Sequence, residues 1–292
     1  MSEMKSKVLV VITCIMMLTN FAFADIIRGI DIDFVTIGNA GNSADTTGYG
    51  AVGHNYRIGK YEITNSQWNA FTGAAGVPAG NPSYAYDQSS TWTSAQQPTN
   101  NISWYEAAQF CNYLTSGQKY SGAYQFDGSG NFLGINRSTS IATYGTTYVI
   151  PTEDEWYKAA YFKPDASGYS LFANGTDVTP IAGVQSNYYN TIGSPWNVGS
   201  GTIIEQNGTF DMMGNVWEWN ETLVDLGRGV RGAAYNSGDV INLTSSGRYS
   251  GLPDSEDNSI SGVFGFRIAS IPEPATLLLL GLGGLMLRKK KH

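Results

Sequence analysis

The 292-residue chain is acidic overall, with 24 aspartate and glutamate residues against 17 lysine and arginine residues and a formal net charge of −7. Both end segments carry a net positive charge. When the net +1 of residues 1–24 and the +4 of residues 288–291 are removed from −7, residues 25–274 carry −12. A domain of that sign repels phosphate backbones, which excludes nucleic acid as a partner and remains compatible with cations.

The first 24 residues have the pattern of a cleaved secretory signal. Lys5 and Lys7 precede an apolar run over residues 8–18, and Ala-Phe-Ala at residues 22–24 supplies a small-residue cleavage site. We therefore predict an exported protein whose mature chain begins at Asp25. A cytoplasmic protein with a buried N-terminal helix is the alternative.

Residues 25–270 are predicted to form one domain with short helices and many loops. Three segments have the capping-box form, in which a hydroxyl side chain begins a helix and a glutamine or glutamate three residues later reaches back; they begin at Thr64, Ser103 and Thr152. Strand-like runs precede them at residues 56–63, 97–102 and 146–151. Residues 116–147 and 163–201 are polar and glycine-rich, which is typical of long surface excursions.

Thiols and imidazoles are scarce in this domain. Cys14 leaves with the signal, so Cys111 is the only cysteine of the core, and His54 is its only histidine. Cys111 recurs at helical spacing with Trp104 and Leu114, so we expect it to face the core as an inert thiol. One thiol cannot close a disulfide by itself.

Acid–base and nucleophilic chemistry find little support in the core. His54 is expected in a loop ahead of a strand, so no base is placed beside Ser237. Glu155 is expected to be the capping-box partner of its own helix. Glu153 and Asp154 are expected to be favourable charges in the first helical turn.

Two carboxylates point to a cation site. Asp211 and Glu218 flank the stretch Met-Met-Gly-Asn-Val-Trp, and if the chain turns at Gly214 the carboxylates and the carbonyls between them converge on one ion. Oxygen-only ligands select a hard ion such as calcium. A packing motif built on Trp217 and Trp219, without metal, is the alternative.

Six blocks of the chain resemble the sulfatase-modifying factor family, to which formylglycine-generating enzyme belongs. They are RIGKYEITNSQWNAF, PTNNISWYEAAQFCNYL, YVIPTEDEWYKAAYF, GTFDMMGNVWEW, RGVRGAAYNS and GFRIA, in the family's order, and they span roughly residues 30–270. The resemblance implies an α+β fold, a single C-type-lectin-like domain with short helices, few strands and long loops. It also implies that bound calcium holds some of those loops.

The resemblance also assigns calcium ligands. At the positions of Asp211 and Glu218 the family uses side chains, and at those of Gly214 and Val216 it uses carbonyls. A second calcium set, in which Asn190 replaces an acidic residue, falls on Asn187, Tyr188, Asn190 and Ile192.

The family's catalytic sulfurs are missing from this sequence. Formylglycine-generating enzyme oxidises a sulfatase cysteine with oxygen and a copper(I) ion held by two cysteines, and copper(I) requires soft thiolates. The matching positions, after the turn at residues 232–234, are Ser237 and Asn242, so copper is not expected. Relatives also bridge the position of Cys111 to a cysteine near the domain end, where this chain has Ile268.

The C-terminal residues resemble a PEP-CTERM sorting signal of exported bacterial proteins. Pro-Glu-Pro at residues 272–274 precedes thirteen apolar residues, 275–287, and a basic cluster at 288–291. The apolar segment is shorter than the ~20 residues of a spanning helix. The resemblance implies sorting machinery as a partner, membrane contact through residues 271–292, and a location in the cell envelope or outside the cell. A permanent short anchor without processing is the alternative.

We expect an exported, surface-anchored relative of the sulfatase-modifying factors that lacks the copper pair and binds a glycan, peptide or protein. The candidate ligand contacts lie in the cleft that relatives use for substrate: Arg231, Tyr235, Asn236 and Ser237. One alternative is an enzyme, a formylglycine-generating-type oxidase with a non-standard site. Another is an envelope component without a discrete ligand. The identity of the ligand and the oligomeric state stay open.

Overall fold

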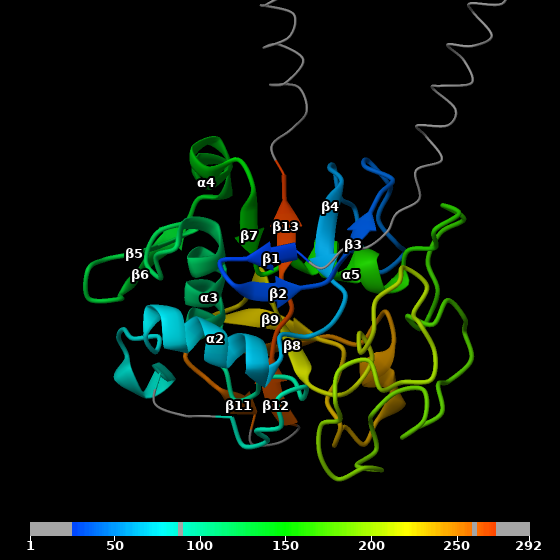
Figure 1. The fold of residues 1–292 in the computed structure, drawn as a ribbon. Helices are drawn as coiled ribbons and strands as arrows, with labels where there is room; N and C mark the ends of the chain where they lie inside the picture. The colour runs from blue at the N-terminus through cyan, green and yellow to red at the C-terminus, as the bar shows by residue number, and fades with distance from the viewer. Residues whose placement is uncertain (1–24, 87–89, 259–261, 273–292) are drawn as a thin grey trace, which may run out of the picture.

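The computed structural model describes residues 25–86, 90–258 and 262–272 (Figure 1). The predicted signal, residues 1–24, and most of the predicted sorting segment, residues 273–292, lie outside the described residues. No helix in the described part of the chain has the length and apolar character needed to cross a bilayer.

The described residues contain four α-helices, and three of them begin at the predicted caps. They are α2 (Asn65–Ala75), α3 (Trp104–Ser116), α4 (Arg137–Tyr144) and α5 (Glu153–Tyr161). Complete capping boxes begin α2 at Thr64, α3 at Ser103 and α5 at Thr152. In each box the hydroxyl accepts from the amide three residues on, and that residue's side chain accepts from the cap amide, so two otherwise unpaired donors are satisfied. The capping-box predictions are confirmed.

Two sheets carry most of the strands. The four-stranded sheet has the order β3 (Phe34–Ile37), β4 (Tyr56–Gly59), β13 (Ala269–Ile271) and β7 (Thr147–Val149), all antiparallel. The five-stranded sheet has the order β10 (Tyr249–Gly251), β9 (Gly227–Arg231), β8 (Trp217–Val224), β12 (Gly262–Gly265) and β11 (Asp257–Asn258). Because β13 lies between β4 and β7, this last described strand joins the N-terminal pair β3–β4 to β7 in one sheet.

Two hairpins and two short 3-10 helices are the remaining elements of the described part of the chain. The hairpins are β1 (Asp25–Ile27) with β2 (Ile30–Ile32), and β5 (Tyr124–Phe126) with β6 (Phe132–Ile135). The 3-10 helices are η1 (Ser83–Tyr86) and η2 (Val240–Leu243). Residues 116–147, expected to be a long loop, therefore contain the β5–β6 hairpin and α4. The polar composition of that segment hid short elements whose outer faces are solvated.

The run over residues 97–102 is not a strand. Pro98 forms only an isolated bridge to Thr64, and proline cannot donate to a sheet ladder. By contrast, residues 163–201 are irregular, as expected, and form the yellow-green loops at the right of Figure 1.

The core is rich in aromatic side chains. Trp104, Trp156, Trp217 and Trp219 are fully buried, and Trp219 packs edge-on against Phe264 with ring centroids 4.5 Å apart. Such pairs add about 0.5–1.5 kcal/mol beyond the area they bury. The aromatic core therefore joins β8 to its parallel neighbour β12.

Cys111 is a buried free thiol on α3, as predicted. Burial raises the pKa of this thiol well above its usual value, which suppresses the reactive thiolate. Ile268, at the position where the resemblance implies a second cysteine, is also fully buried. Burying an isoleucine side chain stabilises a fold by ~2 kcal/mol, so apolar packing contributes here in place of a crosslink.

Candidate functional site

The turn that follows β9 lies where the resemblance places the family's reactive cysteines. Gly232 and Ala233 both have positive φ, 95° and 71°. The Ala234 amide donates to the Ser237 hydroxyl at 3.0 Å, and the Ser237 amide donates to the Ala234 carbonyl at 2.9 Å. Ser237 is only 2% exposed, so its hydroxyl closes the turn and is not presented to solvent.

Asn242, the second position, lies within η2 and is half-buried. The only cysteine of the domain, Cys111, belongs to α3 and is buried beneath its surface. The turn therefore offers hydroxyl, amide and phenol groups, none of which suits copper(I).

Arg231 is part of the interior and not of a ligand surface. It is fully buried, pairs with Glu153 at 2.8 Å, and donates to the carbonyls of Ser245 at 3.1 Å and Gly247 at 2.8 Å. These contacts tie β9 to α5 and to the loop before β10. The prediction that Arg231 contacts a ligand is therefore wrong, because a buried guanidinium that is fully paired is not accessible to a ligand.

Tyr235 and Asn236 remain as surface candidates. Tyr235 is half-buried and packs edge-on against Trp92 with ring centroids 5.1 Å apart. Asn236 is exposed. Trp92 was not anticipated from the sequence, since 143 positions separate it from Tyr235 and no local pattern connects them.

Backbone hydrogen bonds bring three distant segments together beside this turn. The amide of Tyr189 donates to the carbonyl of Ser237 at 3.0 Å, and the amide of Asn190 donates to the carbonyl of Tyr235 at 2.7 Å. The Tyr235 amide in turn donates to Asn215 at 2.9 Å. The predicted ligand contacts, the second calcium set and the segment around Gly214 are therefore neighbours.

Gly214 makes the predicted turn. Its φ is 85°, and a Cβ at this position would lie 2.2 Å from the Asn187 carbonyl oxygen, so only glycine fits. The Asn215 amide then donates to the same carbonyl at 2.8 Å. The close approach places Asn187 directly against the segment that was expected to bind calcium.

The side chain of Asn187 has an unpaired acceptor. The residue is fully buried, and its Nδ2 donates to the Ser194 carbonyl at 3.0 Å and to Oδ1 of Asn215 at 3.2 Å. Its own Oδ1 is buried without a hydrogen-bond partner. An unsatisfied buried acceptor costs about 1–3 kcal/mol, and a cation would satisfy it.

The carboxylate of Glu218 is already paired. Arg267 Nε contacts Oε2 and Nη2 contacts Oε1, each at 2.6 Å, and the Trp156 indole donates to Oε2 at 2.7 Å. Both charged side chains are fully buried. A calcium ion that used Glu218 would share this carboxylate with Arg267, a partner that the sequence analysis missed.

Asp211 belongs to a cluster that is short of positive charge. Its carboxylate accepts from the Trp196 indole at 2.8 Å and from the Gly199 amide at 2.7 Å, and burial raises its pKa to about 6. Burial also raises the pKa of Glu205 to about 8, and that of Glu62 well above its usual value. We call Glu62, Glu205, Asp211, Glu218 and Arg267 the carboxylate-rich cluster.

These residues fit a cation only in part. Within the described ranges, no three side chains of aspartate, glutamate, histidine or cysteine converge as a metal-binding group. The unpaired Asn187 oxygen and backbone carbonyls would have to complete any oxygen shell. The excess of buried carboxylates and the free amide oxygen are the two observations that favour one.

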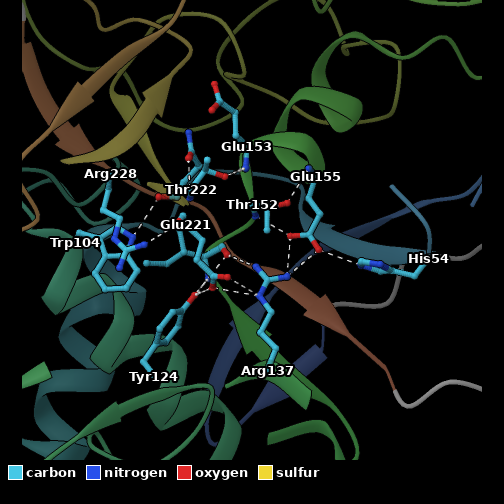
Figure 2. Close-up of polar contacts among 12 residues, drawn as sticks. His54, Trp104, Tyr124, Arg137, Thr152, Glu153, Glu155, Glu221, Thr222 and Arg228 are labelled. Atoms are coloured by element: carbon cyan, nitrogen blue, oxygen red, sulfur yellow. Dashed lines mark hydrogen bonds and ion pairs between the residues drawn. The ribbon is translucent and has the colours of Figure 1, made fainter. Parts of the chain in front are cut away.

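A second buried cluster surrounds the start of α5 (Figure 2). His54 contacts Glu155 at 3.0 Å, Arg137 contacts Glu155 at 2.8 Å and Glu221 at 2.9 Å, and the Tyr124 hydroxyl donates to Glu221 at 2.7 Å. Burial opposes ionisation of Glu155, but Arg137 and the bond from His54 lower its pKa to about 2.

Glu153, two residues earlier, pairs with both Arg231 and Arg248, and the Asp154 carboxylate accepts from the Gly50 amide. We call Glu153, Glu155, Glu221, Arg137, Arg231 and Arg248 the compensated cluster. Its carboxylates are engaged in structural contacts, and Glu155 is the capping-box partner of Thr152, as predicted.

Comparison with known proteins identifies the family and the sorting motif of this chain. The chain matches the sulfatase-modifying factor enzyme 1-like domain over residues 37–271 and the PEP-CTERM protein-sorting motif over residues 270–291. No curated protein matches it significantly. The sorting motif indicates export and sorting to the cell envelope.

Three solved structures share the fold. Treponema denticola variable protein 1 has a TM-score of 0.58 at 19% identity, covering 88% of this chain and 100% of that chain. CarF has a TM-score of 0.53 at 20% identity, with 83% and 99% covered. PvdO from Pseudomonas aeruginosa has a TM-score of 0.52 at 16% identity, with 82% and 94% covered.

At these identities the neighbours establish the fold alone, and they confirm the expected α+β, C-type-lectin-like architecture. The match over residues 37–271 establishes the family. The chain therefore belongs to the sulfatase-modifying factor family and carries a PEP-CTERM sorting motif at its C-terminal end.

Proposed function

We propose that this protein is a non-catalytic binding module displayed at the cell envelope. The observation that carries the proposal is Ser237: at the position of a reactive cysteine, a buried hydroxyl closes a turn. The domain keeps the family fold, but this turn lacks the pair of thiolates that copper(I) requires.

The ligand surface that we propose is built on the turn and on the segment hydrogen-bonded to it. Tyr235 and Asn236 lie beside Tyr189, which is 57% exposed and hydrogen-bonds through its backbone to Ser237. Exposed aromatic and apolar side chains with polar neighbours are typical of surfaces that bind peptides, proteins or glycans.

The position of the sorting motif suits such a role. In Figure 1, β13 ends at the top of the view, and the motif begins at residue 270 within that strand. The loops of residues 163–201 lie at the right and lower side of the domain. A chain attached through its C-terminal end would leave these loops accessible.

The test is ligand binding by the exported full-length protein on glycan and peptide arrays. We expect a hit whose affinity falls about tenfold in Tyr235→Ala, a loss of about 1.4 kcal/mol. Tyr144→Ala, which removes an exposed tyrosine from α4, is the matched control and should bind as the parent does. Equal binding by Tyr235→Ala and the parent would contradict the proposed surface.

We further propose that a structural calcium ion is bound by the side chains of Asn187 and Asp211. Backbone carbonyls within residues 188–216 would complete its oxygen shell. The buried unpaired oxygen of Asn187 and the uncompensated charge near Asp211 support this. Calcium at a hundred times its Kd would stabilise the fold by ~2.7 kcal/mol. Thermal melting with calcium and with a chelator measures the effect.

Two variants separate this from a general ionic effect. Asn187→Ala should abolish the calcium-dependent rise in Tm, whereas Asn236→Ala, an exposed asparagine in the neighbouring turn, should retain it. A Tm that is the same with and without chelator in the parent protein removes calcium from the account.

Membership of the family favours one second candidate, an oxidase that converts a sulfatase cysteine to formylglycine by a non-standard site. Incubating the full-length protein with copper(I), oxygen and a sulfatase-motif peptide tests it by mass spectrometry. Loss of the thiol mass with turnover would replace the binding-module proposal, and an intact peptide would leave it standing.

A further inference from the structure

A cavity of about 460 Å³ opens between the β1–β2 hairpin, the start of α2 and the loop at residue 198. Its lining includes Asp31, Asp33, Tyr61, Ser66 and Gln96. It shares no lining residue with the surface proposed above, so it is a separate place on the molecule. Its volume lies within the range of small-ligand sites.

The two carboxylates point the same way. Ile30, Ile32 and Phe34 alternate into the core, so Asp31 and Asp33 lie on the opposite, outer face. In the described part of the chain, neither carboxylate has an ion-pair or hydrogen-bond partner; only their backbone carbonyls are used, by Gln67 and Lys60.

The two basic side chains nearest in sequence, Arg28 and Lys60, make other contacts. Arg28 donates from its guanidinium to the carbonyls of Leu114 and Thr115, each at 3.1 Å, at the end of α3. Lys60 Nζ lies over the rings of Tyr61 and Phe210, 5.3 and 5.6 Å from their centroids. The cavity lining contains no lysine, arginine or histidine, so its two negative charges are uncompensated locally.

Aromatic stacking on Tyr61 is not the main interaction that this cavity offers a ligand. One face of Tyr61 stacks on Phe210 at 5.4 Å, and Gly199 lies close enough that an added Cβ would be 2.7 Å from the ring. Gln67 is used at both ends, accepting from Thr64 and donating to Asp31. What remains is an excess of acceptors, which suits a ligand group that only donates. An ammonium has three donors and no acceptor.

We propose that this cavity binds a primary ammonium group, held between the carboxylates of Asp31 and Asp33. Charge-assisted hydrogen bonds from N⁺–H to carboxylate are about twice as strong as neutral ones, and an anion would be repelled. Lysine side chains, polyamines and amino sugars all carry this group.

Titration calorimetry of the exported full-length protein with three probes distinguishes these sources: spermidine, Nα-acetyl-lysine methylamide and glucosamine. The neutral counterparts of the last two are Nα,Nε-diacetyl-lysine methylamide and N-acetylglucosamine. We expect at least one ammonium probe to bind, and acetylation to weaken binding at least about tenfold, or 1.4 kcal/mol.

Matched variants assign the site. Asp31→Asn and Asp33→Asn should each weaken binding about tenfold while leaving the Tm unchanged. Asp225→Asn removes a carboxylate from the exposed turn between β8 and β9 and should bind as the parent does. Equal losses in all three variants would show a general charge effect and overturn the proposal. So would equal affinity for acetylated probes, or no binding by any ammonium probe.

Discussion

Two buried clusters of acidic residues in this protein differ in one respect, the supply of positive charge. In the compensated cluster, Arg137 pairs with Glu155 and Glu221 (Figure 2), and Arg231 and Arg248 pair with Glu153. In the carboxylate-rich cluster, Arg267 pairs with Glu218 while three further carboxylates have no ion-pair partner among the described residues. The pKa values differ between Glu155, where the pKa is lowered to about 2, and Glu205, where it is raised to about 8. Burial also raises the pKa of Glu221 in the compensated cluster, although Arg137 opposes that shift.

The comparison separates a finished electrostatic arrangement from an unfinished one. A buried charge is tolerated when it is paired and hydrogen-bonded, and otherwise it takes up a proton or binds an ion. The first cluster therefore acts as a brace between α5, β8 and β9. The second is where an additional cation would stabilise the fold.

Removing Arg267 should have the largest effect. Arg267→Met leaves Glu218 buried without its partner, and breaking a buried pair from one side costs about 3–5 kcal/mol. Arg248→Met is the control, because its side chain is 29% exposed and its partner Glu153 keeps Arg231; we expect a loss of ~1 kcal/mol. Urea unfolding measures both, and equal losses would remove the distinction between the clusters.

Raising the pH should act on the carboxylate-rich cluster. Because the folded-state pKa of Glu205, about 8, lies above its unfolded value, its contribution is fully present below pH ~4 and is lost as the pH rises toward 8. The loss is on the order of 2 kcal/mol, since relaxation of the buried site absorbs part of the shift. In the absence of calcium, Glu205→Gln should flatten the fall in Tm between pH 5 and 8, and an unchanged slope would contradict the assignment.

Lowering the pH should act on the compensated cluster. The pKa of Glu155, about 2, lies below its unfolded value, so its contribution is present above pH ~4 and is lost as the pH falls toward 2. Glu155→Gln should therefore be less stable than the parent at pH 7, by about 1–3 kcal/mol, and should approach it near pH 2. Tm measured across this range in both proteins tests the expectation.

His54 should have the smallest effect. It contacts Glu155 from the exposed end of the compensated cluster, with 46% of its side chain in solvent, and Arg137 already pairs with the same carboxylate. His54→Gln should cost less than ~1 kcal/mol. A larger loss in urea unfolding would mean that the cluster depends on its exposed member.

Local patterns in the sequence predicted what local chemistry governs. The capping boxes at Thr64, Ser103 and Thr152, the burial of Cys111 and the turn at Gly214 all follow from residues within a few positions of one another. The six sequence blocks that resemble the family predicted the fold. The elements within residues 116–147 were missed because short strands and helices with solvated faces have weak periodicity.

Long-range partners were out of reach of the same reasoning. Arg267 is 49 residues from Glu218, Trp92 belongs to a loop before α3, and Asn187 meets Gly214 only through a parallel bridge. A hint was present for the first pair, since a lone arginine in an apolar C-terminal stretch requires a buried acceptor.

The sequence by itself determined the sorting motif, the family fold, the starts of three helices and the lack of a second cysteine in residues 25–274. Only the tertiary structure decided which charges are compensated, that Arg231 is interior, and that Asn187 keeps an unpaired oxygen. The physical reason is that hydrogen-bond caps and turns depend on neighbours in the chain. Desolvation and ion pairing depend on whatever the fold brings within a few ångströms.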